Sequence, residues 1–181
     1  MLTFNKLWEC HPTITNEDNP CTTNGEKNFA NQCAIRVGVA LAKCGVSTSN
    51  IPGATHCWHG HDKSQGHVIR AEELANGLNK FPIAGVQKAI KVKPDEFADR
   101  LFGKKGIIFF KDYWQRTSNG RKESFRNRSG DHIDLWNGRR TTSISSWARI
   151  YLRFGDFGLH SISDEWSDYE DSKQVWFWRI M

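Results

Sequence analysis

Residues 31–45 read NQCAIRVGVALAKCG, and this stretch decides the fold of the chain. Its apolar residues occupy nearly every face of a helix, a pattern that is typical of a helix buried on all sides. Asn31 is a favourable N-terminal cap, and Gly45 is a favourable stop. We therefore expect a buried helix that begins near Asn31 and carries Cys33 in its first turn.

Around this helix the sequence predicts helices first and strands later. Residues 11–28 are rich in Asn, Thr, Pro and Gly, and we expect residues 1–28 to form a loose N-terminal arm. Hydrophobic spacing predicts further helices over 69–81, 94–101 and 144–154, and strands over 103–114, 131–138 and 174–180. This order indicates a segregated α+β fold, a buried helix packed on an antiparallel sheet, in a single domain over residues 1–181.

The composition excludes some classes of protein. Of the 181 residues 38% are hydrophobic, and eight Trp and eleven Phe supply the large apolar surfaces of a folded chain. No run approaches the roughly 18 apolar residues of a membrane span, and the start lacks the pattern of a signal peptide. We therefore expect no membrane insertion, and export without a cleaved signal. The net charge of +5 favours an anionic partner, such as nucleic acid, an acidic lipid surface or peptidoglycan, without choosing among them.

Cys33 and His132 are the candidate catalytic residues. The unpaired amides at the start of a helix lower the pKa of a thiol, and they can also stabilise an oxyanion. His132 lies in the strand predicted within DHIDLWNG, where alternation places it on one face with Asp134, opposite Ile133 and Leu135. Each residue alone also has a structural interpretation, as a packed thiol or a hydrogen-bonded strand histidine. Together they predict a cysteine nucleophile with a histidine base.

The segments NQCAIRVGVAL, GKKGIIFF and DHIDLWNG, in this order and spacing, resemble the fourth family of type VI secretion amidase effectors. The resemblance covers roughly residues 31–138. It implies a papain-like, NlpC/P60-type fold in which Cys33 and His132 are the catalytic pair, with no cofactor and no metal.

The resemblance also implies a biological role. The chain is expected to be a toxin made in the cytoplasm, secreted, and active in the periplasm of competing bacteria. Its expected reaction is cleavage of the amide between γ-D-glutamate and meso-diaminopimelate in peptidoglycan stem peptides. The expected partners are the stem peptide, a cognate immunity protein and the type VI secretion apparatus, and not nucleic acid.

A third polar residue is implied as well, an Asp in related members, which would orient the imidazole. The sequence does not decide which residue takes this role, and the candidates are Asp134, Asn137, Thr142, Ser143 and Asp156.

The loop HCWHGH contains side chains that suit zinc, at His56, Cys57, His59 and His61. Because a zinc site of this type needs a separated second pair of ligands, and none is evident, we expect an exposed loop without stoichiometric zinc. With Cys33 reserved for catalysis, the remaining cysteines form an even set that is compatible with zero, one or two disulfides of unknown pairing: Cys10, Cys21, Cys44 and Cys57.

The sequence leaves two interpretations open for each of two basic features, Arg36 and a basic stretch before His132. Arg36, one turn beyond Cys33, is either a cation for a substrate carboxylate or an arginine that braces the buried helix. A basic stretch between Trp114 and His132 is either a solvated loop beside the substrate or a nucleic-acid-binding loop, and its cations are Arg116, Arg121, Lys122, Arg126 and Arg128.

Two alternatives to the toxin therefore stay open. One is a housekeeping NlpC/P60 hydrolase of the producer's own wall, and the other is a nucleic-acid-binding module without catalysis.

Overall fold

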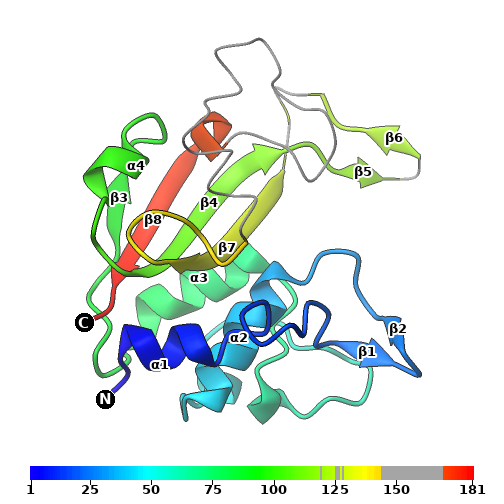
Figure 1. The fold of residues 1–181 in the computed structure, drawn as a ribbon. Helices are drawn as coiled ribbons and strands as arrows, with labels where there is room; N and C mark the ends of the chain where they lie inside the picture. Colours follow the sequence, from blue (N-terminus) through cyan, green and yellow to red (C-terminus); the bar gives the residue numbers. More distant parts are fainter. Residues whose placement is uncertain (119, 125–126, 128, 144–168) are drawn as a thin grey trace.

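Four antiparallel strands form the main sheet of the protein, in the order β3-β8-β4-β7 (Figure 1). The computed structural model describes residues 1–118, 120–124, 127, 129–143 and 169–181. The sheet strands are β3 (Ile90–Val92), β4 (Gly106–Trp114), β7 (Gly130–Trp136) and β8 (Gln174–Arg179). The short strands are β1 (Thr22–Thr23), β2 (Glu26–Lys27), β5 (Thr117–Ser118) and β6 (Arg121–Lys122).

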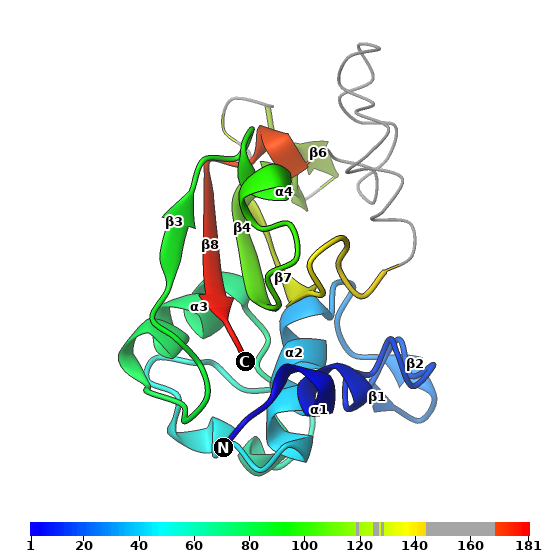
Figure 2. The same ribbon diagram turned by 60° about the vertical axis from the view of Figure 1, so that its left-hand side comes forward.

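Helices surround this sheet. The α-helices are α1 (Phe4–Glu9), α2 (Cys33–Lys43), α3 (Ala71–Lys80) and α4 (Phe97–Arg100), and the 3-10 turns are η1 (Thr48–Asn50), η2 (Lys63–Gln65) and η5 (Tyr169–Asp171). In Figure 2, β8 passes in front of α3, and α4 lies in front of β4. The α+β class expected from the sequence is thus confirmed, with helices on both sides of one antiparallel sheet, although short strands also precede α2.

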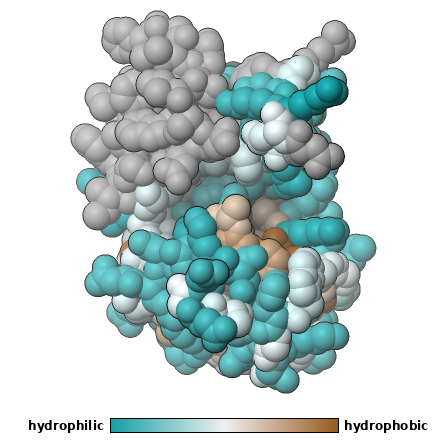
Figure 3. Space-filling model, turned by 90° about the vertical axis from the view of Figure 1, so that its right-hand side faces the viewer, coloured by the Kyte–Doolittle hydropathy of each residue, from teal (hydrophilic) through white to brown (hydrophobic). Residues whose placement is uncertain are grey.

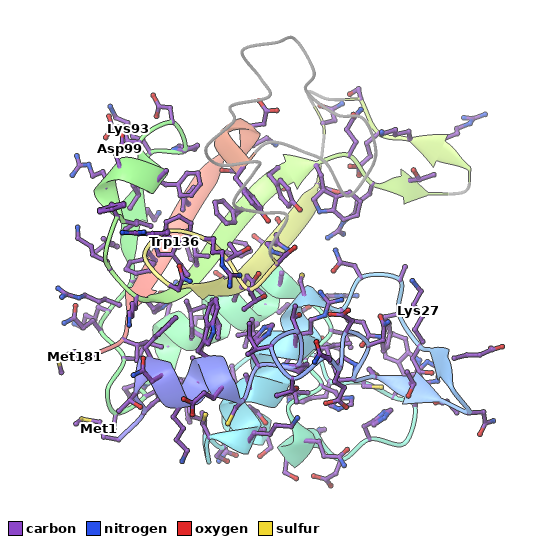
Figure 4. The ribbon with its side chains drawn as sticks, viewed as in Figure 1. Met1, Lys27, Lys93, Asp99, Trp136 and Met181 are labelled. Carbon is purple, nitrogen blue, oxygen red and sulfur yellow. The ribbon has the colours of Figure 1, made fainter. Side chains whose placement is uncertain are left out.

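The alternation of the strands divides the core into two layers. On one face, Ile107, Phe109 and Leu135 pack with apolar residues of α1, α2 and α3. On the other, Ile108, Phe110 and Trp136 pack with α4 and η5. The Trp136 side chain is labelled in Figure 4, and its indole Nε1 donates to the Leu101 carbonyl oxygen at 3.0 Å. Both faces of the sheet are therefore buried, which fixes the register of its strands.

Helix α2 is buried on nearly every side, as its sequence predicts. It contacts β7, α3 and α1, and Gly38 allows a close approach of the chain at Gly66. A Cβ on Gly38 would lie 2.0 Å from the Gly66 carbonyl oxygen, a distance that no side chain tolerates. The helix therefore has a fixed position between the sheet and the loop that contains Gly66.

The prediction that residues 1–28 form a loose arm is wrong, because parts of this segment pack into the core. Helix α1 packs Phe4 and Leu7 into the core, and the Phe4 amide donates to the Met181 carbonyl oxygen at 3.1 Å. The chain ends consequently lie close together (Figure 1). Six helical residues are too few to show a hydrophobic period, which is why the sequence did not reveal this helix.

Other boundaries differ in smaller ways. The predicted helices over 69–81 and 94–101 are present as the shorter α3 and α4, whereas strand β3 was not predicted. Part of the polar stretch before β7 forms the β5–β6 hairpin. The helix predicted over 144–154 lies outside the described residues. Among the described helices, none has the length and apolar composition required to cross a membrane.

Candidate active site

Cys33 is the first residue of α2, at the position expected from the sequence. Its backbone amide donates to Asn31 Oδ1 at 3.0 Å, so an oxyanion can use this amide only after Asn31 releases it. Gln32, the cap residue, is buried and binds the backbone of Cys21 at both its N–H and its carbonyl, at 2.9 and 3.0 Å. The chain segment that leads into α2 is therefore held in place by the side-chain amides of Asn31 and Gln32.

His132 lies on β7, one of the two edge strands of the main sheet, opposite Phe110 of β4. Aromatic rings surround its imidazole: Phe110 stacks at a centroid distance of 6.5 Å, and Tyr113 and Tyr169 lie 5.9 and 5.8 Å away. The β7 alternation predicted from the sequence is confirmed, since Ile133 belongs to the opposite layer of the core. The ring is thus presented by a rigid strand with its orientation limited by neighbouring rings.

Cys33 and His132 form an interacting pair. Burial alone would raise the pKa of the Cys33 thiol, but its hydrogen bond with His132, the charge of that imidazole, a backbone hydrogen bond with Ile133 and the charge of Arg36 bring the pKa below its usual value. Burial alone would lower the pKa of His132, but Tyr169 and the neighbouring Asp134 and Cys33 side chains hold it well above its usual value. Both shifts favour the thiolate and imidazolium forms that a cysteine nucleophile requires.

Asp134 is the candidate third residue that contacts the imidazole. Its Oδ2 lies 3.6 Å from His132 Nε2, and its side chain is nearly inaccessible. The Leu135 amide donates to Oδ1 at 2.7 Å, and the Thr142 hydroxyl donates to Oδ1 and Oδ2 at 2.7 and 3.0 Å. Burial opposes ionisation, but the nearby His132 ring, the charge of His11 and the Thr142 hydrogen bond lower the pKa of Asp134 to about 2. The carboxylate is therefore ionised and fixed beside the ring.

The remaining candidates for the third residue have other positions. Thr142 binds Asp134 instead of the imidazole. Asn137 Oδ1 accepts the amides of Arg139 and Arg140, both at 3.0 Å, and so shapes the turn after β7. Ser143 has interacting neighbours of its own. Asp156 lies outside the described residues.

His11 is a site residue that the sequence did not indicate. Its Nε2 lies 3.6 Å from Asp134 Oδ1, so the carboxylate has an imidazole on each side. Burial lowers the pKa of His11 to about 4, with Asp134 and Asp18 acting in the opposite direction and Arg36 and His132 in the same direction as burial. The ring is therefore neutral near pH 7. A histidine in a segment of loop composition gives no sign of burial, and only its packing against β7 reveals it.

Arg36 braces the helix in the structure. Its Nε donates to the Asp18 carbonyl oxygen at 2.7 Å and thereby ties α2 to the N-terminal segment. In the basic stretch, Arg116 lies 3.9 Å from Asp131, and Arg121 and Lys122 form strand β6. Arg126 and Arg128 lie outside the described residues.

The side of the molecule with β1, β2, β5 and β6 faces the viewer in Figure 3. On this face a small apolar area lies among hydrophilic side chains.

The side chains of the HCWHGH loop have different neighbours in the structure. Cys57 and His61 lie with Cys21 and His67 in one cluster, whereas His56 pairs with Val68 in an isolated bridge. The His59 ring packs against Phe29 and Trp58. All five cysteines, each within the described residues, have free thiols.

Comparisons with known proteins agree with this architecture. A sequence model of the type VI secretion system (T6SS) amidase effector protein 4, Tae4, matches residues 29–178. The effector-immunity complex Tae4-Tai4 from Enterobacter cloacae has a chain of similar structure, with a TM-score of 0.64 and 17% identity over 100% of both chains. The Tae4 effector from Enterobacter cloacae is similar with a TM-score of 0.62 and 15% identity, over 100% of this chain and 98% of that one.

No curated protein sequence matches the chain. At these low identities the solved structures show a shared fold, while the family model identifies the sequence itself across most of its length. The match confirms the resemblance seen in the motifs around Cys33 and His132. The chain therefore belongs to the type VI secretion system amidase effector 4 family, whose members are amidases that act on peptidoglycan.

Proposed function

We propose that this amidase is a cysteine endopeptidase that cleaves the γ-D-glutamate to meso-diaminopimelate bond of stem peptides, with Cys33, His132 and Asp134 as its catalytic triad. The observation that carries the proposal is the succession of contacts among these three side chains, from a helix start through an imidazole to a buried carboxylate. Such a series is the arrangement that activates a thiol for acyl transfer.

In the proposed reaction, the Cys33 thiolate attacks the carbonyl carbon of D-glutamate. The imidazolium of His132 then gives its proton to the leaving amine of diaminopimelate, and a thioester remains on Cys33. Water, deprotonated by His132, attacks this thioester and releases the glutamyl product and the thiol. Asp134 holds the ring in place and stabilises its charged form throughout.

The arrangement also supports a papain-like fold of the NlpC/P60 type. In this proposal, helix α2 presents the nucleophile at its first residue, and it packs on an antiparallel sheet whose edge strand presents the base. The two reacting groups then come from two rigid elements, so their separation does not depend on a loop.

The bond specificity rests on family membership and on one electrostatic argument. A γ-linked D-glutamate keeps a free α-carboxylate beside the scissile carbonyl. Arg36 places a positive charge near both Cys33 and His11, although its Nε is engaged by Asp18. We propose that this charge attracts the α-carboxylate of the substrate.

Delivery and inhibition follow the family in this proposal. The effector is secreted by the type VI apparatus, enters the periplasm of a competing bacterium, and is inhibited in the producing cell by a cognate immunity protein. The support is the family match, together with the Tae4-Tai4 effector-immunity complex that has a similar chain.

Digestion of purified sacculi tests the mechanism. Cys33→Ala is expected to release no muropeptide fragments, as measured by mass spectrometry, because the variant cannot form the thioester. Cys44→Ala is the matched control, since Cys44 caps the opposite end of the same helix and is expected to leave activity intact. Activity in folded Cys33→Ala would disprove the proposed nucleophile.

A defined tetrapeptide muropeptide tests the bond. The expected products are the disaccharide carrying L-Ala-D-Glu and the free dipeptide of diaminopimelate and D-Ala. Release of the intact tetrapeptide from the sugar would instead show cleavage at the lactyl-L-alanine bond, and the proposed specificity would be wrong.

A further inference from the structure

Four side chains of types that bind metals lie close together in loops of the structure. The proposed reaction does not use these loops. The four side chains are Cys21, Cys57, His61 and His67, and one possible ligand atom from each lies within 4.8 Å of all the others. We refer to them as the Cys/His quartet. Cys21, Cys57 and His67 are buried and His61 is partly buried, so the quartet is not a chance meeting of flexible surface side chains.

The spacing of the quartet suits a tetrahedral ion. With zinc about 2.3 Å from sulfur and about 2.0–2.1 Å from nitrogen, tetrahedral angles require sulfur atoms about 3.8 Å apart and sulfur-to-nitrogen distances of about 3.6 Å. The two Sγ atoms lie 3.3 Å apart, and His61 Nδ1 lies 3.8 Å from Cys21 Sγ and 3.4 Å from Cys57 Sγ. Only small shifts of the side chains are needed to receive the ion.

The surroundings of the quartet are those of a metal-bound thiolate pair. The backbone amide of His59 donates to Cys57 Sγ at 3.3 Å, and Asn28 Nδ2 donates to Cys21 Sγ at 3.5 Å. Such donors stabilise the negative charge of a ligating sulfur. His67 Nδ1 is buried and has no hydrogen-bond partner among the described residues, although a buried ring nitrogen normally has one.

From this geometry we infer that Cys21, Cys57, His61 and His67 bind one structural zinc ion. Two thiolates and two imidazoles in a tetrahedral set select zinc over harder cations such as magnesium or calcium. Because all four positions are filled by protein, the site has no open position for catalysis and its role is structural. This inference reverses the expectation of a zinc-free loop, since Cys21 and His67 supply the separated second pair of ligands.

The zinc ion would fix the start of α2. Cys21 is held through both its backbone groups by Gln32, which immediately precedes Cys33. On the other side, the loop between Cys57 and His67 includes Gly66, whose carbonyl lies against the helix at Gly38. One ion therefore joins the N-terminal segment and this loop around the helix that presents the nucleophile, and the inference does not depend on the proposed reaction.

Metal analysis of the full chain tests the inference. The protein is produced in a reducing cytoplasm and purified without a histidine tag and without chelator. Elemental analysis is expected to give about one zinc ion per chain, and replacement by cobalt(II) is expected to give the visible absorption of a tetrahedral thiolate site. Native mass spectrometry distinguishes a zinc adduct from a Cys21–Cys57 disulfide, which loses two hydrogens and gains no metal.

Two variants with a matched control locate the ion. His61→Ala and Cys57→Ser are expected to lose the zinc, whereas His59→Ala, in the same loop but outside the quartet, is expected to keep it. If Cys57→Ser fails to fold, His61→Ala and reversible removal of zinc from the wild type with a chelator still decide the matter. Wild-type protein without zinc, a Cys21–Cys57 disulfide in its place, or zinc retained in folded His61→Ala would each overturn the inference.

Discussion

The candidate active site and the Cys/His quartet both place thiols beside imidazoles, yet they support opposite chemistry. At the active site one thiol meets one imidazole, and a buried carboxylate lies 3.6 Å behind the ring. In the quartet two sulfur atoms lie 3.3 Å apart with two imidazoles beside them. A single thiol paired with an imidazole is free to react, whereas two thiols and two imidazoles can be fully engaged by a cation.

The two regions also differ in what positions them. The active-site residues lie on α2 and β7, which pack directly against one another, while the quartet comes from loops. A bound ion can replace the packing that these loops lack. Gln32 connects the regions, since it holds Cys21 and precedes Cys33. The comparison is therefore open to test through variants that damage one region and leave the other intact.

Replacement of His132 should have the largest effect. His132→Ala removes both the base and the charge that lowers the pKa of Cys33, so the rate of muropeptide cleavage is expected to fall by at least about 10⁴-fold. The zinc content is expected to stay at the wild-type level because the ring is not part of the quartet. Loss of zinc together with activity would show that the two regions are structurally coupled.

Asp134→Asn should have the next largest effect. The amide keeps the shape of the side chain but cannot stabilise the imidazolium, and kcat is expected to fall by about 10⁴-fold. Asn137→Ala, in the turn after β7, is the control and should change kcat little. Equal losses in both variants would assign Asp134 a structural role only.

The sequence predicts much of the catalytic framework because the evidence is local. The helix that starts at Cys33 and the strand that carries His132 are visible as periodic patterns, and the family motifs lie within them. The third residue is different, since its role depends on which carboxylate a folded turn brings to the ring. Thr142 binds Asp134 in the structure, a contact that no spacing rule predicts and that supports the proposal of Asp134.

The quartet was not predicted for the same reason. Two of its residues lie in HCWHGH, but Cys21 precedes Cys57 by 36 residues and belongs to a segment without periodicity. The N-terminal helix and His11 share this difficulty, because short segments of loop composition reveal their burial only through tertiary packing. Contacts between loops that are far apart in the sequence are thus the part of the structure that could not be predicted.

Differential alkylation compares the thiols of the two regions directly. At neutral pH iodoacetamide is expected to label Cys33 faster than the other cysteines, because its pKa is lowered. Cys21 and Cys57 are expected to become reactive only after a chelator removes the zinc. Peptide mapping after timed labelling gives the rates, and equal labelling of all five thiols in folded protein would contradict both assignments.

His11 should make stability depend on pH. Its pKa is lowered from 6.5 to about 4 on folding, so its contribution is fully present above pH 6.5 and is lost as the pH falls toward 4. The difference of about 2.5 pH units corresponds to roughly 3 kcal/mol of unfolding free energy. Denaturant unfolding at a series of pH values measures this loss.

The matched variant for this test is His11→Gln, which keeps a polar side chain that does not titrate. The wild type minus variant difference is the quantity to examine, since other groups titrate in the same range. Asp131 is one, because burial raises its pKa to about 6, which weakens stability as the pH rises. An unchanged pH profile in His11→Gln would mean that His11 is not buried as a neutral ring.

Thr142→Val should have the smallest effect. The substitution keeps the shape of the side chain and removes the hydroxyl that donates to Asp134, while the Leu135 amide still donates at 2.7 Å and the residue 142 amide at 3.3 Å. Because the carboxylate retains these donors, the expected loss is about 2 kcal/mol of unfolding free energy, near the lower end for a hydrogen bond to a charged group. Catalysis should fall less than tenfold, since Asp134 stays ionised beside His132. A double variant with His61→Ala completes the comparison: additive losses within about 0.5 kcal/mol indicate that the triad and the quartet act independently, whereas a larger interaction would mean that the zinc loops and Gln32 transmit strain through α2 to the catalytic carboxylate.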